Sequence, residues 1–246
     1  MTTKETKNTN SVTIPSAEDM VKAGVHFGHR TSRWNPKMDQ YIFTTKNDVH
    51  IIDLEKTIEK LNEALSFLKD VASKGGSILF LGTGPSSREI VEKTAKETGM
   101  PYVSNRWLGG TITNFKIISK RLEYFRELER KREAGELKKY TKKEQLDFDE
   151  ELKKLERKFG GIKKMTKLPE ALFVLDPVKN DLAIKEANLA KIKIVALCDT
   201  NINPMVIDYP IPSNDDAVSA LELMAKTVAQ AIEEGKAQKQ ELAEEK

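Results

Sequence analysis

Residues 76–103, GSILFLGTGPSSREIVEKTAKETGMPYV, decide the fold class that the sequence predicts. The apolar run 78–81 has the length of a buried strand, and 86–98 predicts a helix that Gly99 closes. Residues 102–103 then predict a second strand. A strand, a helix and a strand in this order form a parallel pair joined by a crossover helix. The stretch therefore predicts one unit of an α/β sheet.

The same alternation continues on both sides of this unit. Upstream, Asp53 starts an amphipathic helix that ends at Gly75. The other predicted elements are a β-hairpin at 41–43 and 49–52, strands at 171–175, 192–197 and 206–211, a helix at about 181–190, and a long helix capped by Asn214. Strands that alternate with helices form a parallel sheet covered on both faces. We predict an α/β domain with a doubly wound parallel sheet, built from residues 15–111 and 166–234.

Residues 112–165 interrupt the alternation and predict an antiparallel helical hairpin. Apolar residues recur at coiled-coil spacing in two stripes, Phe115, Ile118, Leu122 and Phe125, then Phe148, Leu152, Leu155 and Phe159. Thr141 and Glu144 form a capping box for the second arm. Residues 112–167 carry 18 lysines and arginines against 11 acidic residues. The hairpin is therefore either a solvated, charge-rich helix pair or an arm that lies against a polyanion.

The composition is that of a heavily charged chain. Of its 246 residues 32% are charged and 39% hydrophobic, but the net charge is only +3, so a nucleic-acid surface would have to come from local clusters. The single cysteine, Cys198, excludes an internal disulfide, and no apolar run reaches membrane-spanning length. We expect a cytoplasmic protein with a disordered tail at 1–14 and a charged, frayed tail at 235–246.

Residues 23–43 form a basic and aromatic stretch. Its cations and rings, with Lys22 just before it, are Lys22, His26, Phe27, His29, Arg30, Arg33, Trp34 and Lys37. On irregular backbone, cations of this kind neutralise phosphates and flat rings stack on unpaired bases, which suits RNA. The alternative is a surface loop that Phe27 and Trp34 anchor in the domain, with its charges merely solvated.

A second cluster of interest covers residues 106–114. Gly109 and Gly110 allow another backbone to approach closely, while Arg106 and Trp107 offer a cation and a ring. The alternative is a hinge loop with Trp107 buried. Both readings can hold, because a loop can anchor with one face and bind with the other. Lys116, shortly after this loop, joins the candidate RNA contacts.

The rest of the chain shows a scaffold without recognisable catalytic residues. The turn 82–87 follows a strand and opens a helix, as a dinucleotide loop does, but it lacks the third glycine, and Pro85 has no backbone donor. Asp176, Asp199 and Asp208 fall near the carboxyl ends of predicted strands, yet no nucleophile and base accompany them. We predict no catalytic residue and no cofactor.

His26 and His29 superficially suggest a metal site. No cysteine or carboxylate lies near them in the sequence, so a four-ligand site cannot be assembled locally. Asp199 and Asn203 are better explained as caps of a turn before Pro204. We therefore predict no metal site.

Six segments, in order along nearly the whole chain, resemble the bacterial ribosomal protein S2 family, also called the universal uS2 family. They are GVHFGH at 24–29, RWNPKM at 33–38, RWLGGT at 106–111, LPEA at 168–171, DTN at 199–201 and NDDA at 214–217. One departure stands in the turn after the first sheet strand. Gly84 follows Gly82 and Thr83 there, where the family often has a lysine.

The resemblance implies a flavodoxin-like sheet of strand order 2-1-3-4-5, an inserted coiled-coil hairpin and a structural, non-enzymatic role. It also implies a ribosome-bound protein that binds small-subunit ribosomal RNA between head and body, contacts neighbouring ribosomal proteins and helps to dock ribosomal protein S1. The family's contact loops match residues 30–37 and 106–110. The candidate RNA-binding residues are thus Lys22, His26, His29, Arg30, Arg33, Trp34, Lys37, Arg106, Trp107 and Lys116.

The residues alone also leave two other functions open. One is a nucleotide-dependent enzyme that uses the turn at Gly82. The other is an adaptor whose helical hairpin grips a partner helix.

Overall fold

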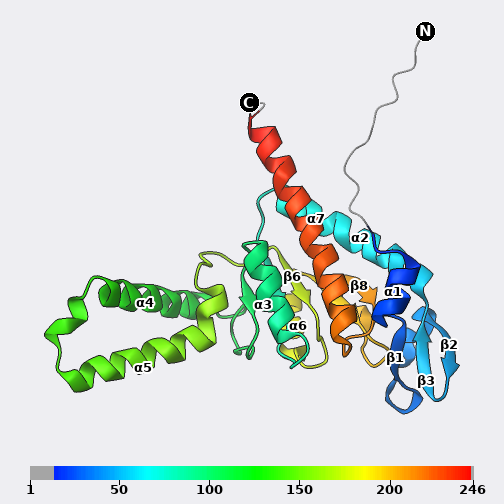
Figure 1. Ribbon diagram of the computed structural model, residues 1–246, viewed down its shortest axis with the longest axis horizontal. Coiled ribbons are helices and arrows are strands. Elements are labelled where there is room, and N and C mark those ends of the chain that lie inside the picture. The colour runs from blue at the N-terminus through cyan, green and yellow to red at the C-terminus, as the bar shows by residue number, and fades with distance from the viewer. Residues whose placement is uncertain (1–13, 245–246) are drawn as a thin grey trace, which may run out of the picture.

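The computed structural model describes residues 14–244, and its centre is a five-stranded parallel sheet (Figure 1). The strands are β4 (Ile78–Leu81), β5 (Tyr102–Val103), β6 (Ala171–Val174), β7 (Lys193–Cys198) and β8 (Tyr209–Pro212). They lie in the order β5-β4-β6-β7-β8, and each neighbouring pair is parallel. The predicted α/β class with a parallel sheet is confirmed. The prolines of β8 lie at the sheet edge, where a missing backbone donor is tolerated.

Helices cover both faces of the sheet. They are α1 (Ala17–Ala23), α2 (Leu54–Ser73), α3 (Arg88–Glu97), α6 (Asp181–Leu189) and α7 (Val218–Glu244). Successive side chains of a strand point to opposite faces, so Phe80 packs in the hydrophobic cluster that contains α2, α3 and α7. Its neighbour Leu79 packs in the other cluster, with α6 and the hairpin. Because both faces are covered, every residue of β4 and β6 is buried, and these strands are continuous apolar runs.

A second, antiparallel sheet has the order β1-β3-β2, with strands β1 (Phe27–Arg30), β2 (Ile42–Lys46) and β3 (Val49–Ile52). β2 and β3 confirm the predicted hairpin, and Asn47 and Asp48 take the positive φ angles that a two-residue hairpin turn requires. The expectation of irregular backbone between Gly24 and the strand at 41–43 is wrong in part. That stretch contains β1 and two short 3-10 helices, η1 (Thr31–Arg33) and η2 (Pro36–Tyr41).

Two helices project from the sheet within residues 112–165, where the sequence predicts a helical hairpin. They are α4 (Phe115–Glu133) and α5 (Lys142–Phe159), with the 3-10 helix η3 (Glu136–Lys139) between them and η4 (Gly160–Ile162) after them. Figure 1 shows α4 leading away from the sheet and α5 returning to it. The capping box of Thr141 and Glu144 is present. Leu122 and Leu155 lie buried between the helices, in the cluster that continues beneath the sheet.

The ends of the chain differ in part from the expectation. Asn214 lies four residues before α7 and does not cap its first turn directly: its Oδ1 accepts from the backbone N–H groups of Asp216 and Ala217, in the turn that leads into the helix. The predicted frayed tail at 235–246 is instead helical as far as Glu244, as part of α7. The predicted tail at 1–14 lies outside the described residues except for Ile14. Within residues 14–244, no helix is both long enough and apolar enough to cross a membrane.

Candidate nucleic-acid interface

The candidate residues gather along the edge where the parallel strands end. The loop after β5 carries Arg106, and Asp199 directly follows β7. Because β5 lies at one side of the sheet and β7 near the other, the two sequence clusters lie at opposite ends of this carboxyl edge. The expectation that Asp208 lies at the carboxyl end of a strand is wrong, because Asp208 precedes β8. Its carboxylate accepts from the backbone N–H of Ile194 and pairs with Lys193, both at the start of β7.

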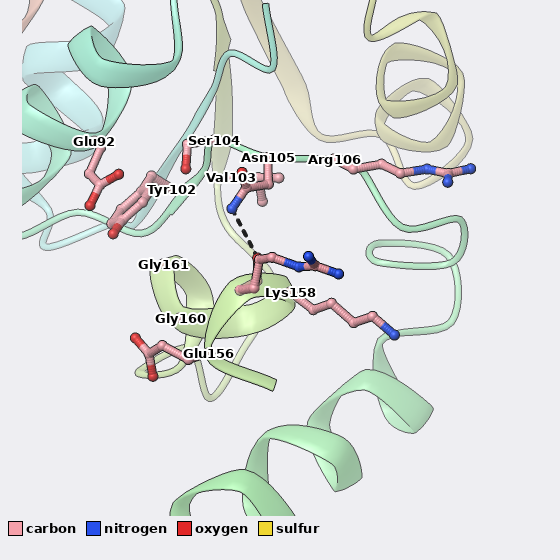
Figure 2. Close-up of a pocket in the computed structure, with 11 residues that line it drawn as sticks. Glu92, Tyr102, Val103, Ser104, Asn105, Arg106, Glu156, Lys158, Gly160 and Gly161 are labelled. Carbon is pink, nitrogen blue, oxygen red and sulfur yellow. Dashed lines mark hydrogen bonds between the residues drawn. The ribbon is translucent and has the colours of Figure 1, made fainter. Parts of the chain in front are cut away.

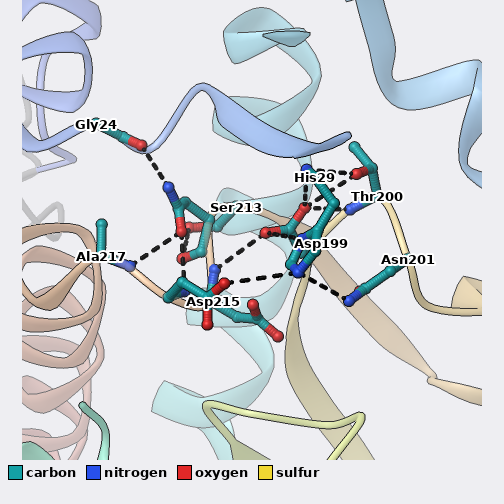
Figure 3. A network of polar contacts seen from close by, with 10 residues as sticks. Gly24, His29, Asp199, Thr200, Asn201, Ser213, Asp215 and Ala217 are labelled. Atoms are coloured by element: carbon teal, nitrogen blue, oxygen red, sulfur yellow. Dashed lines mark hydrogen bonds and ion pairs between the residues drawn. The ribbon is translucent and has the colours of Figure 1, made fainter. Parts of the chain in front are cut away.

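Asp199 ties β1 to this edge (Figure 3). Its buried carboxylate accepts the backbone N–H of His29 at 3.2 Å and lies 3.0 Å from His29 Nδ1. Thr200 accepts the same His29 N–H at 2.9 Å through its hydroxyl. The backbone N–H of Asn35 donates to Thr200 O at 2.7 Å. The basic stretch is therefore held at several points against the end of β7.

The hydrophobic anchors of this stretch are Met38 and Tyr41, which lie in the core beneath it. Phe27 and Trp34 do not anchor it, because they stay 48% and 37% exposed. The Trp34 ring lies 5.1 Å from that of His50, and 37% of the residue's surface reaches solvent. A rigidly held loop therefore presents flat rings to solvent, which suits stacking better than packing.

Four exposed cations lie in or directly before the same stretch of chain, and we call them with Trp34 the β1 patch: Lys22, Arg30, Arg33, Trp34 and Lys37. All five are exposed. Arg30 and Arg33 line a groove of about 480 Å³ together with His29 and the carboxylates of Asp199 and Asp216. Within the described residues no carboxylate pairs with any of the four cations, so their charges remain available to a polyanion.

His26 is less suited to contact than the other candidates. Its ring lies 4.1 Å from that of Phe27, and its Nδ1 is buried without a hydrogen-bond partner. Burial lowers the pKa of His26. The imidazole is therefore neutral at pH 7 and contributes no charge to the β1 patch.

The second cluster is organised by a buried carboxylate that the sequence analysis misses. Glu186, on α6, accepts the indole N–H of Trp107 at 3.1 Å and the backbone N–H groups of Gly110, Ile112 and Thr113 at 2.8 to 3.1 Å. Burial alone would raise the pKa of Glu186, but these donors hold it below its ordinary value. One acidic side chain therefore shapes the whole loop that leads into α4.

Trp107 is accordingly a correction among the candidate contacts. It is only 6% exposed, and its N–H is engaged by Glu186, so its ring packs in the core and cannot stack on a base. Arg106 and Lys116, on either side of it, are both exposed. The loop therefore buries the ring of Trp107 and leaves the side chain of Arg106 exposed.

The two tryptophans should respond differently to a soluble quencher. With Trp107→Phe leaving only Trp34, we expect acrylamide to quench the emission several-fold more strongly than with Trp34→Phe, which leaves only Trp107. The reason is the exposed surface of Trp34 and the buried position of Trp107. Stern–Volmer slopes of the two folded variants provide the measurement, and equal slopes would contradict the assignment of the two rings.

The only group of possible metal ligands found in the described residues comprises His29, Asp199 and Asp215, whose ligand atoms lie within 4.8 Å of one another. Neither aspartate is near His29 along the chain, and only the fold brings the three side chains together. Their nitrogen and oxygen donors could hold a divalent cation. The hydrogen bond to Asp199 raises the pKa of His29 against the opposing effect of burial.

Asp215→Asn should stabilise the protein by roughly 2 kcal/mol more at pH 8 than at pH 5. Burial raises the pKa of Asp215 to about 7, and the carboxylates of Asp199 and Asp216 act in the same direction. A carboxyl with a raised pKa in the fold stabilises at low pH, and this contribution is lost as the pH rises through about 7. Urea unfolding at both pH values, in chelator, measures the difference.

The exposed neighbour provides the control for this prediction. Asp216→Asn removes the same charge from a side chain that is 70% exposed, so its effect should be small at either pH. A stabilisation by Asp215→Asn that is equal at pH 5 and pH 8 would contradict the role of ionisation.

The turn after β4 resembles a dinucleotide loop, but an internal carboxylate occupies its donors. Asp176 accepts from the backbone N–H groups of Thr83 and Gly84 and from the hydroxyl of Ser87. These are the groups that would hold a phosphate in a nucleotide-binding loop. The expected tight strand-to-helix turn is confirmed, and its polar groups are already satisfied from within the chain.

The sequence is also similar to proteins of known family. The family model described as Ribosomal protein S2 matches residues 20–235. The Small ribosomal subunit protein uS2 of Roseiflexus castenholzii is 49% identical over 229 residues, which are 93% of this chain and 87% of the relative. The protein of the same name from Roseiflexus sp. (strain RS-1) is 48% identical over the same shares. The chain belongs to the ribosomal protein S2 family.

Proposed function

We propose that this protein binds small-subunit ribosomal RNA along the carboxyl edge of its sheet. The contacts are the β1 patch and His29 at one end, and Arg106 and Lys116 at the other. The observation that carries the proposal is the β1 patch itself: exposed cations without carboxylate partners, beside an exposed tryptophan, on a loop held rigidly by Asp199. Pre-organised contacts of this kind lose little conformational entropy when RNA binds.

Family membership gives the chain a non-enzymatic role as a structural constituent of the small ribosomal subunit. We infer a flavodoxin-like strand order and a coiled-coil hairpin. The strand order β5-β4-β6-β7-β8 supports the flavodoxin-like order 2-1-3-4-5 when strands are counted along this sheet alone. Leucines and phenylalanines buried between α4 and α5 support a coiled-coil hairpin.

We further propose that the protein is bound to cytoplasmic ribosomes between the head and body of the small subunit. There it contacts neighbouring ribosomal proteins and helps to dock ribosomal protein S1. The hairpin supports a protein partner, because Ile117 is 56% and Leu146 is 66% exposed on its surface. Exposed apolar side chains on a projecting helix pair suit a contact with another protein.

The experiment that tests RNA binding is sedimentation of the tagged protein from lysate through sucrose gradients at low and high salt. We expect co-migration with the small subunit at low salt. For rebinding to stripped subunits, the logarithm of the affinity should fall with log salt by about 0.7 for each neutralised phosphate of unpaired RNA. If the protein stays at the top of the gradient at both salt concentrations, the proposal is wrong. An affinity for stripped subunits that does not change with salt would contradict it as well.

Arg33→Ala combined with Arg106→Ala should reduce the fraction incorporated into small subunits by about tenfold or more, because two phosphate contacts are lost. Both side chains are exposed, so the unfolding midpoint should not move. The matched control is Lys167→Ala with Lys193→Ala, which removes the same charge at the opposite edge of the sheet, where both lysines are ion-paired. Equal incorporation of the two double variants would exclude Arg33 and Arg106 as contacts.

A further inference from the structure

We infer that the crevice where the hairpin joins the sheet is a second RNA site, in which Arg106, Arg157 and Lys158 hold the phosphate backbone. This inference rests on the proposed function, and it adds Arg157 and Lys158, which neither sequence cluster contains, to the contact at Arg106. The crevice has a volume of about 160 Å³ and lies between the end of β5 and the end of α5 (Figure 2). We call Arg106, Arg157 and Lys158 the hinge cations.

The crevice is built by the close approach of two segments distant in sequence. Asn105 Nδ2 donates to the backbone oxygen of Arg157 at 3.1 Å and so joins the loop after β5 to the last turn of α5. Gly161 lies so close to the backbone oxygen of Tyr102 that a Cβ at position 161 would collide with it. The walls are therefore fixed by backbone contacts, and the side chains that line them are free to face a ligand.

The charges within the crevice are separated. Figure 2 shows Arg106 and Lys158 extending to one side, while Glu92 and Glu156 lie with Tyr102 on the other. Within the described residues none of the hinge cations is ion-paired. Some cations on the flanks of the hairpin are neutralised by carboxylates, as Arg130 is by Glu127 and Arg132 by Asp149. The hinge differs from the rest of the hairpin because its three unpaired cations line one crevice together.

The chemistry of the hinge cations favours phosphate over a stacked base. Two guanidinium forks and one ammonium group match phosphate oxygens. The crevice offers no exposed aromatic face on its basic side, and its volume is too small for a drug-sized ligand. A polyanion that follows the basic side avoids Glu92 and Glu156, which would repel a free anion from the acidic side.

The consequence is a clamp across the hinge. Arg106 belongs to the sheet, whereas Arg157 and Lys158 belong to the hairpin. An RNA strand that contacts all three would bind both parts at once and hold the hairpin at one angle to the sheet. Truncating the hinge cations of the hairpin should therefore weaken binding without unfolding either part.

The test compares two double variants on small subunits stripped of this protein. Arg157→Ala with Lys158→Ala should weaken rebinding about tenfold and lower the salt slope by roughly 0.7 to 1.4, as expected for one or two lost phosphates. Lys142→Ala with Lys143→Ala removes the same charge from exposed, unpaired lysines at the far end of α5 and should change rebinding by less than threefold. Circular dichroism checks that each variant is folded.

Directed hydroxyl-radical cleavage identifies what the crevice contacts. Lys154→Cys places an iron chelate one turn before Lys158 and leaves the hinge cations in place, and the native thiol does not compete because Cys198 is buried. We expect cleavage of the ribosomal RNA from this position. Weakened rebinding without RNA cleavage would mean that an acidic protein surface fills the crevice, and would overturn the RNA assignment.

The outcomes separate this inference from the proposed function. If the unaltered protein rebinds with a steep salt dependence but the hinge variant behaves like the Lys142 and Lys143 control, the hinge site is wrong and the β1 patch still stands. If the unaltered protein shows no salt-dependent rebinding, the proposed RNA function fails, and the hinge site fails with it.

Discussion

Glu186→Ala should lower the free energy of unfolding by about 3–5 kcal/mol, because several buried donors lose their acceptor together. Its carboxylate binds the indole N–H of Trp107 and the backbone N–H groups of Gly110, Ile112 and Thr113. No other acceptor is bonded to these groups among the described contacts. The loop between β5 and α4 should therefore lose its shape as the protein loses stability.

Urea unfolding and acrylamide quenching of Trp107 in a Trp34→Phe background measure the two effects of Glu186→Ala. We expect a lower midpoint and, in the folded state, an emission that is more easily quenched. Glu186→Gln should fall in between, since one oxygen remains but an NH2 group then faces N–H donors. The control is Lys185→Ala, an exposed neighbour paired with Asp181, whose effect should stay within about 0.5 kcal/mol. An equal effect of both alanine substitutions would contradict the anchoring role.

Asp176→Ala should be the second most damaging change, with a loss of about 3–4 kcal/mol. Asp176 is buried at the end of β6 and also accepts from the side-chain amide of Asn180 at 2.6 Å, so it joins the turn after β4 to the start of α6. Burial raises the pKa of Asp176 against the opposing effect of its donors. The stability it contributes is therefore greatest at low pH and decreases as the pH rises through its folded pKa.

Thermal and urea unfolding of Asp176→Ala, beside the exposed control Asp181→Ala, measure this loss. Calorimetry of the unaltered protein with common nucleotides tests the same site, and we expect no saturable binding because Asp176 already occupies the donors of the turn. Micromolar nucleotide binding would revive an enzymatic reading of this turn.

The elements that the sequence predicts well are those whose signal is local. The apolar run at β4, the capping box of Thr141 and Glu144 and the turn that Asn214 forms before α7 each depend on residues a few positions apart. Their hydrophobic spacing and capping chemistry determine the element almost irrespective of its surroundings. The alternation of strands and helices then limits the sheet to a parallel, two-sided arrangement.

The features that the sequence analysis misses depend on distant partners. β1 is a strand only because β3 pairs with it, and its bonds to Asp199 and Thr200 reach across 170 and 171 positions. Trp107 is buried by a carboxylate 79 positions away. The one local signal that could have pointed to Glu186 is its position among Ala183, Ile184 and Ala187, which form the buried face of α6, since buried acids require donors.

Insertion of the hairpin between strands that become neighbours has a consequence for synthesis of the chain. β4 pairs with β6, yet Ile78 and its partner Ala171 are separated by the hairpin and everything around it. During translation the first strand of the sheet emerges long before the strand that must cover its edge, so the nascent chain carries an unsatisfied β-edge through much of its elongation. High contact order of this kind slows folding. The pairing of β4 with β6 can therefore form only after residue 174 has left the exit tunnel of the ribosome that makes the chain.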